Sequence, residues 1–185
     1  APEKEFLSNP IALLRDNKNN EFWVGTESNG LFRINDDKME MTTHYVLDEN
    51  DEKSFSSNAV KTIYEDKKGN IWIGSAGEGV YRYNRDSDNF DRWSAQDGLP
   101  SNTVLSIVDD KEGSIWLGTR RGVSRLLDNN QFQSFEISDG LPANIFNDRS
   151  VGINSKGEIY FGSVSGLTAV DPKLIVTNNE TPKLA

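Results

Sequence analysis

The side chains best suited to binding chemistry recur at equivalent points of a repeated pattern. Arg120 and Arg121 are adjacent, and arginine presents a planar fork of donors that suits a carboxylate or sugar hydroxyls. Phe146, followed by Asn147-Asp148-Arg149, offers an aromatic face beside polar groups. We predict a ligand-binding site made by these residues and their equivalents in other repeats: Glu78, Asn102, Arg120, Arg121, Asn144, Phe146 and Arg149.

Each candidate also has a structural explanation. Surface arginines are more often solvated or ion-paired than engaged with a ligand, and Phe146 could equally belong to the core. Trp72 and Trp116 recur at mid-strand positions, which predicts packing between repeats rather than a platform for sugars. Trp93, near the end of an outer strand, is also predicted to pack.

Residues that could support catalysis or bind a metal are few. Glu65-Asp66 and Asp109-Asp110 recur beside turns, so we predict that they form turns rather than an acid–base pair. With His44 as the only histidine and no cysteine, neither a usual zinc site nor a Ser-His-Asp triad can be assembled. The acidic run from Asp48 to Glu52 lacks the glycine and spaced glutamate of a calcium loop. We predict a non-enzymatic segment without cofactor or metal.

An aromatic residue, an apolar residue and a glycine recur four times and place these candidates on a fold. The aromatics are 49, 44 and 44 residues apart, in Trp23-Val24-Gly25, Trp72-Ile73-Gly74, Trp116-Leu117-Gly118 and Tyr160-Phe161-Gly162. A period in the forties with about four strand-like segments is typical of β-propeller blades. We predict an all-β fold of four four-stranded antiparallel blades, over residues 7–47, 55–94, 100–137 and 143–172.

The third repeat shows the strand pattern most clearly. Four β-prone segments are separated by turns rich in Gly, Asp and Asn, and they span residues 101–108, 114–119, 123–126 and 131–137. The first repeat has Asn19-Asn20 where the others have a turn glycine, and asparagine tolerates the left-handed backbone region. The strands therefore provide a scaffold, and any function belongs to the loops.

The composition of the chain argues against two classes of binding partner, nucleic acids and membranes. A net charge of −9 argues against binding to nucleic-acid backbones or anionic lipid surfaces. No segment approaches 18 consecutive apolar residues, so we expect no membrane contact by this segment. The first residues lack a basic region followed by an apolar run, so no signal peptide is expected in them.

Four blades account for nearly the whole sequence, which bears on how the ring is completed. An open arc of four blades would leave two blade faces bare, and such apolar faces are normally covered. We therefore predict further blades of a larger ring or self-association. A closed four-bladed ring is the alternative.

The links between repeats carry a resemblance to a known family. Asp97-Gly98-Leu99-Pro100-Ser101-Asn102 leads into a strand and then Ile115-Trp116-Leu117-Gly118-Thr119, and Asp139-Gly140-Leu141-Pro142-Ala143-Asn144 repeats the link. Together these closely resemble the two-component regulator propeller repeat, over roughly residues 11–172. The link at Asp48 to Asn58 lacks Gly-Leu-Pro, and Tyr160 replaces the tryptophan of the last repeat.

The resemblance implies a location and a function. It implies the periplasmic, extracytoplasmic sensor region of a membrane-anchored bacterial receptor, whose output domain is often a histidine kinase. Residues 173–185 would then be an exit segment leading into a following immunoglobulin-like domain. The resemblance also implies a carbohydrate or related small-molecule ligand, such as an oligosaccharide.

Blade topology selects the face on which the ligand would bind. The links and the turns between second and third strands lie on one face, and their side chains differ from blade to blade. We predict that this face binds the ligand above the central channel. A protein-interaction propeller is the first alternative, and a fragment of a propeller lyase or glycosidase is the second.

Overall fold

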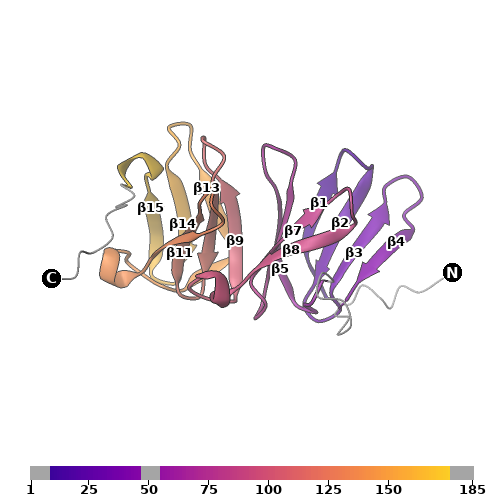
Figure 1. The fold of residues 1–185 in the computed structure, drawn as a ribbon, viewed down its shortest axis with the longest axis horizontal. Coiled ribbons are helices and arrows are strands. Elements are labelled where there is room, and N and C mark those ends of the chain that lie inside the picture. Colours follow the sequence, from indigo (N-terminus) through magenta and orange to yellow (C-terminus); the bar gives the residue numbers. More distant parts are fainter. Residues whose placement is uncertain (1–8, 47–54, 176–185) are drawn as a thin grey trace.

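The structure consists of antiparallel β-sheets that stand in a row. A computed structural model describes residues 9–46 and 55–175 of the chain. In Figure 1 the sheets lie side by side, with β4 and β15 at opposite ends of the row. The row formed by the described residues does not close into a ring. Residues 48–52, weighed above as a cation loop, and most of the exit segment lie outside the described residues.

Each sheet follows the chain from one strand to the next. The first contains β1 (Pro10–Asp16), β2 (Glu21–Thr26), β3 (Leu31–Asn35) and β4 (Met41–Tyr45). The second contains β5 (Val60–Glu65), β6 (Ile71–Ser75), β7 (Val80–Asn84) and β8 (Asn89–Trp93). The third contains β9 (Val104–Asp109), β10 (Ile115–Thr119), β11 (Gly122–Leu126) and β12 (Phe132–Phe135). The fourth contains β13 (Phe146–Ile153), β14 (Ile159–Ser163) and β15 (Gly166–Val170).

These sheets confirm the predicted all-β propeller blades, with one difference in the last blade. Three blades have four strands, whereas the described residues supply three strands to the fourth. There the chain leaves β15 through the 3-10 helix η3 (Pro172–Leu174). Two further 3-10 helices, η1 (Ala95–Asp97) and η2 (Ile137–Asp139), lie in the links. No helix in the described part of the chain is long and apolar enough to cross a membrane.

The first strand of each blade lies innermost and contacts the first strand of the next blade. β1 contacts β5, β5 contacts β9, and β9 contacts β13. Three buried apolar clusters fill the spaces between consecutive blades, and their largest side chains include Trp23, Tyr81, Leu117, Trp116 and Phe161. The core is therefore a series of interfaces between blades, as the recurrence of Trp72 and Trp116 predicts.

The glycine of the repeated motif sets how closely two blades approach. A Cβ atom on Gly25 would lie 2.3 Å from Cγ1 of Val60 in the next blade. A Cβ atom on Gly74 would lie 2.8 Å from the backbone oxygen of Val104. Real Cβ contacts are not this short, so any larger residue would push the next inner strand away. The motif therefore needs glycine for space between blades.

The aromatic residue of the motif is anchored by the turn before its strand. Nε1 of Trp72 donates to Oδ2 of Asp66 at 2.9 Å, and Nε1 of Trp116 donates to Oδ2 of Asp110 at the same distance. The other carboxylate oxygen of Asp66 accepts the backbone N–H groups of Lys68 and Asn70. These carboxylates therefore form turns, as predicted, and also satisfy a buried indole.

An arginine of the third strand lies over the indole ring of each of these two tryptophans. Register places Arg82 beside Trp72 and Arg125 beside Trp116. Their guanidinium carbons lie 5.8 Å and 5.5 Å from the indole centroids. Such a contact contributes roughly 0.5–2 kcal/mol. In the fourth blade Tyr160 takes the place of tryptophan, and its hydroxyl lies 3.3 Å from Nδ2 of Asn154.

We expect Gly74→Ala to destabilise the chain by roughly 1–3 kcal/mol, because the added methyl group collides with backbone of the next blade. Chemical denaturation would measure the loss. Gly152→Ala is the matched control, since a Cβ atom there meets nothing within 4 Å and its φ is not left-handed. Equal stability of the two variants would contradict the role given to Gly74.

The Asp66 anchor makes stability depend on pH. Burial acts to raise the pKa of Asp66, but hydrogen bonds from Trp72 and Asn70 outweigh it and lower the pKa below its usual value. The unfolded chain, in which the pKa of an Asp is about 3.9, then binds the proton more readily than the folded chain does. The stability from this carboxylate is present above that pH and is lost as the pH falls through the lower folded pKa.

We therefore expect Asp66→Ala to lower the free energy of unfolding by roughly 1–3 kcal/mol at pH 7, because the indole and turn N–H groups lose their acceptor. The deficit relative to the parent chain should shrink below about pH 4, where the unfolded chain begins to bind a proton at Asp66 and the parent loses the contribution of this carboxylate. Denaturant titrations at several pH values would measure it. Glu112→Ala, in an exposed turn position, is the control. An unchanged stability of Asp66→Ala at pH 7 would refute the anchor.

Candidate functional site

The links between blades fold into compact capped turns. Ser94 and Asp97 form a capping box at η1, and Gly98 follows with a φ of 95°. The Asn102 side-chain oxygen accepts the backbone N–H of Ala95 at 2.6 Å. The next link repeats this arrangement at η2, with Gly140, and with Asn144 accepting the N–H of Ile137. Side-chain oxygens that accept backbone N–H groups therefore hold the Asp-Gly-Leu-Pro links in their compact shape.

Asn102 and Asn144 also fix each link to the preceding blade. The backbone oxygen of Asn102 accepts N–H groups from Gly77 and Gly79, in the loop between β6 and β7. That of Asn144 accepts the N–H of Gly122 in the third blade. Links and loops therefore share one face, as predicted, and the two asparagines position this face through their backbone and side-chain oxygens.

Glu78 lies beside a polar hollow on the same face. Arg92 forms an ion pair with its carboxylate and also donates to its backbone oxygen. The hollow, about 280 Å³, is lined by Arg92, Ser94, Gln96, Asp97 and Asn102. Glu78 and Asn102 are thus brought together, though 24 residues apart in sequence. The sequence analysis missed Arg92, because its contact with Glu78 depends on the pairing of β8 with β7.

Arg120 and Arg121 lie in the loop between β10 and β11, and both are exposed. Their backbone N–H groups donate to Thr103 and Thr119, which fixes the loop. Neither guanidinium forms an ion pair within residues 9–46 and 55–175. Both side chains are therefore positioned on the link face with their donors directed to solvent.

Phe146 requires a correction. Its ring is only 2% exposed and packs edge-on against Phe161, with centroids 5.6 Å apart. A ring buried between strands cannot stack on a ligand at the surface. The structural explanation of Phe146 therefore applies, because its position at the start of β13 turns it into the third inter-blade cluster.

Arg149 lies in an unusual bulge of β13. In the first three blades one residue of the inner strand is unpaired, namely Ile11, Lys61 or Leu105. In β13, Phe146 pairs with Ser163 and Val151 pairs with Phe161, so residues 147–150 bulge out together. Arg149 has a φ of 56°, a conformation that a non-glycine residue adopts at a cost in energy.

The bulge lies beside a groove between the inner strands of all four blades. We call this hollow the axial groove; its volume is about 250 Å³, and it is lined by Ala12, Leu13, Thr62, Ile63, Tyr64, Ile107, Val108, Arg149 and Val151. Next to it, Nζ of Lys61 lies 3.5 Å from Oδ2 of Asp148, which joins the second blade to the fourth. A comparison of the bulged residues of the first three repeats would have revealed Lys61, because it is charged whereas its equivalents Ile11 and Leu105 are aliphatic.

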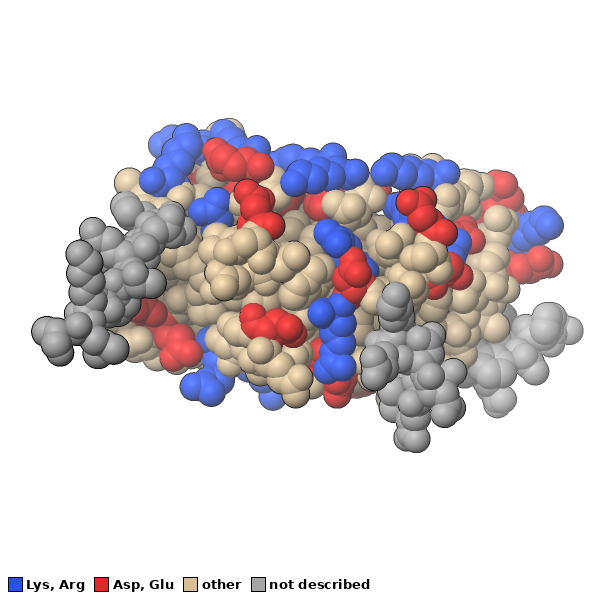
Figure 2. Space-filling model, in the orientation of Figure 1, with Lys and Arg blue, Asp and Glu red and all other residues tan. Residues whose placement is uncertain are grey.

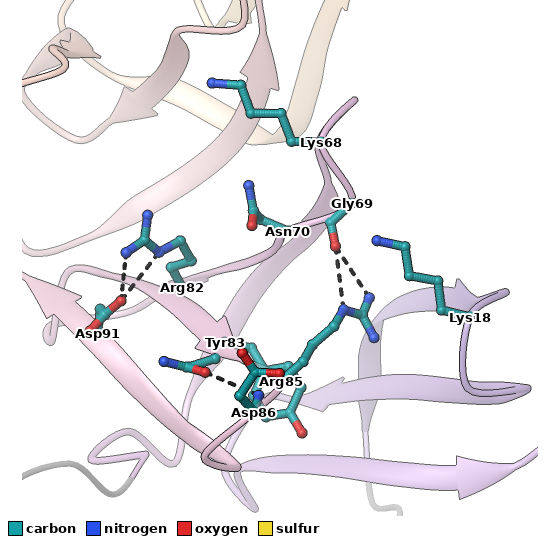
Figure 3. Close-up of a pocket in the computed structure, with 10 residues that line it drawn as sticks. Lys18, Lys68, Gly69, Asn70, Arg82, Tyr83, Arg85, Asp86 and Asp91 are labelled. Atoms are coloured by element: carbon teal, nitrogen blue, oxygen red, sulfur yellow. Dashed lines mark hydrogen bonds and ion pairs between the residues drawn. The ribbon is translucent and has the colours of Figure 1, made fainter.

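A larger hollow, about 350 Å³, lies on the opposite face between the first two blades (Figure 3). Its arginines already have partners. Arg82 pairs with Asp91, and Arg85 donates to the backbone oxygen of Gly69 and to the buried carboxylate of Asp16. These interactions link strand ends and turns, so this hollow is a structural ion-pair network.

The remaining candidates for chemistry have structural roles. His44 stacks on Phe32 with centroids 4.0 Å apart, and its Nε2 lies 2.8 Å from the backbone oxygen of Asn29. Within the described residues no group of three His, Asp or Glu side chains could hold a metal ion. Trp93 is buried and contacts Trp72, which confirms the packing role predicted for it.

The sheets, their links and their inter-blade glycines define a series of β-propeller blades. Two segments, residues 54–77 and 98–121, match the family model of the two-component regulator propeller. These segments cover the start of the second and third blades, and they confirm the resemblance found in the sequence. No curated protein matches the chain.

Solved structures show the same architecture. The extracellular domain of a hybrid two-component system from Bacteroides thetaiotaomicron superposes with a TM-score of 0.81 at 25% identity, over 92% of this chain and 23% of that one. The extracellular domain of a one-component system from the same species gives 0.73 at 21% identity, over 89% and 24%. This chain thus spans about a quarter of their length.

More distant propellers share the fold alone. A catalytically inactive virginiamycin B lyase from Staphylococcus aureus superposes with a TM-score of 0.66 at 14% identity, over 90% of this chain and 57% of that one. Residues 54–77 and 98–121 thus match two-component regulator propeller repeats, and the fold of the chain is similar to that of extracellular domains of such systems.

Proposed function

We propose that this module is the ligand-sensing part of a bacterial membrane receptor, located outside the cytoplasm, and that its ligand is a carbohydrate or related small molecule. The observation that carries the proposal is the structural likeness to extracellular domains of two-component systems. The ligand class follows from the family resemblance. The link face and the axial groove offer the polar and apolar surfaces that such a ligand needs.

The distribution of polar side chains supports binding on the link face. Arg120 and Arg121 are exposed there and form no side-chain ion pair with other described residues, and the Glu78–Arg92 pair adds a carboxylate and a guanidinium one blade away. Arginine and carboxylate groups hydrogen-bond sugar hydroxyls with defined geometry. A ligand that contacts both loops would join the second and third blades.

Signal transfer would then be a shift between receptor arrangements. Links and loops on this face are tied by backbone hydrogen bonds, so a ligand that bridges two blades favours one relative placement of them. A ligand shifts such an equilibrium only by its difference in affinity for the two states. The segment after η3 would pass the shift to the following part of the receptor.

The structural role of the turn carboxylates favours a binding function for the module over an enzymatic one. Asp66 and Asp110 each accept an indole N–H and turn N–H groups, so they are engaged in holding the blade. The likeness to a lyase is one of fold alone. Enzymatic activity would need carboxylates that converge on a substrate.

The test is a binding screen with immobilised oligosaccharides cut from plant, microbial and host polysaccharides. We expect at least one to bind, and we expect replacing Arg120 and Arg121 together by Ala to weaken that binding roughly tenfold to a hundredfold. The loss of a single charged hydrogen bond, worth about 1.5–3 kcal/mol, accounts for a change of this size. Lys156→Ala, an exposed cation in a turn of the opposite face, is the control.

Two outcomes would count against parts of this proposal. Failure of every oligosaccharide to bind would retire the carbohydrate ligand. Binding that is unchanged in the double variant would retire the link face.

We also propose that the two end blades are covered in the native assembly, by further blades or by a second copy. Met41 in the first blade and Leu167 in the fourth are 50% and 66% exposed. Exposed apolar side chains at both ends of an open row favour burial against another surface. The length of the structural relatives supports further blades as the cover.

When no further blades are present, we expect the chain to self-associate as its concentration rises. Replacing both Met41 and Leu167 by Glu should shift the equilibrium to monomer, because a carboxylate resists burial in an apolar contact. Sedimentation equilibrium would measure both proteins, with Arg121→Glu as a charge control on the link face. A parent chain that stays monomeric at every concentration would contradict the self-association.

A further inference from the structure

The four inner strands are alike except at one place. Three of them leave a single residue unpaired, whereas β13 leaves residues 147–150 unpaired and holds Arg149 at a φ of 56°. A bulge re-aims side chains, and a strained non-glycine residue persists only where its surroundings hold it. The sequence could relieve this strain with a glycine, yet it places an arginine there.

The charge at the bulge is not balanced. Lys61 and Asp148 pair with each other at 3.5 Å, so their charges compensate. Arg149 is exposed and forms no ion pair within the described part of the chain. One positive charge therefore remains at the edge of the axial groove, in a molecule whose net charge is −9.

The groove beside that charge is mainly apolar. Its lining includes Leu13, Ile63, Val108 and Val151, which come from four different blades. The hydroxyl of the lining residue Tyr64 is already donated to Oδ1 of Asp109. A volume of about 250 Å³ equals roughly eight water molecules at ~30 Å³ each, enough for one small ring.

We propose that the axial groove binds a ligand that carries a carboxylate on a small ring, with the Arg149 guanidinium paired to the carboxylate and the ring on the apolar wall. This inference rests on the proposed function, because it names the ligand chemistry of the same sensing module. The planar fork of arginine matches a carboxylate bidentately. An acidic sugar such as a uronate combines the required charge with a ring face.

The pairing gives the strain at Arg149 a purpose. A left-handed residue in a bulge directs its side chain differently from the regular strand residues on either side. The pairing also makes the site selective. A neutral sugar of the same shape would leave the guanidinium without its partner and would bind less tightly.

The test is a titration of the chain with D-glucuronate, D-glucose and benzoate at constant ionic strength, followed by methyl NMR signals of Leu13, Ile63 and Val151. We expect glucuronate to shift these signals, and glucose to bind at least tenfold more weakly. Arg149→Gln should weaken glucuronate binding at least tenfold. Lys156→Gln, on the opposite face, should leave it unchanged.

Arg149→Gly separates binding from folding. Glycine adopts a φ of 56° without strain, so this variant should melt at a higher temperature than the parent chain while losing glucuronate binding. A merely structural role for Arg149 would not give a more stable protein that binds less well.

Three results would overturn the proposal: no shift of the groove signals with any probe, equal affinity for glucuronate and glucose, or unchanged affinity in Arg149→Gln. Its failure is distinct from failure of the carbohydrate proposal. Oligosaccharide binding that ignores Arg149 would retire the axial carboxylate site alone. Arg149-dependent binding of benzoate without binding of any sugar would retire the carbohydrate and keep the anion site.

Discussion

The rest of the structure depends on the distance between consecutive blades. That distance is set where the backbone of one blade meets the inner strand of the next, at Gly25 and Gly74. With no side chain there, Val60 and Val104 come close enough for the apolar clusters between blades to pack without gaps. The buried tryptophans, the turn carboxylates that hold them and the inner strands around the axial groove all take their positions from this contact.

The links join the loops of consecutive blades into one continuous face. Each Asp-Gly-Leu-Pro link caps a short 3-10 turn and then bonds to the loop of the blade before it. The buried Leu99 secures the link to the core. The loops of consecutive blades are thus held at fixed spacing, which a ligand that spans two blades requires.

Much of the fold could be predicted from the sequence, because each blade repeats a strong local pattern. The left-handed turn at Asn20, the packing of Trp116 and the shared face of links and loops are all confirmed. The residues of the candidate site were harder to predict from the sequence. Phe146 pairs with Ser163 as Val60 pairs with Ser75 and Val104 with Thr119, so it takes the buried position of those two valines. The long bulge that follows it has no equivalent in the other blades, and no repeated pattern in the sequence predicts the bulge or the placement of Arg149 in it.

The bonds between links and loops have a consequence for how such a module can change over time. They are made chiefly by backbone atoms of residues such as Gly77, Gly122 and Asn144, whereas the side chains of Arg120 and Arg121 take no part in the frame. Substitution at those arginines therefore alters the chemistry of the face without dismantling it. Under the proposed function, a gene encoding such a module can acquire a new specificity by point substitution and keep a folded product at every step.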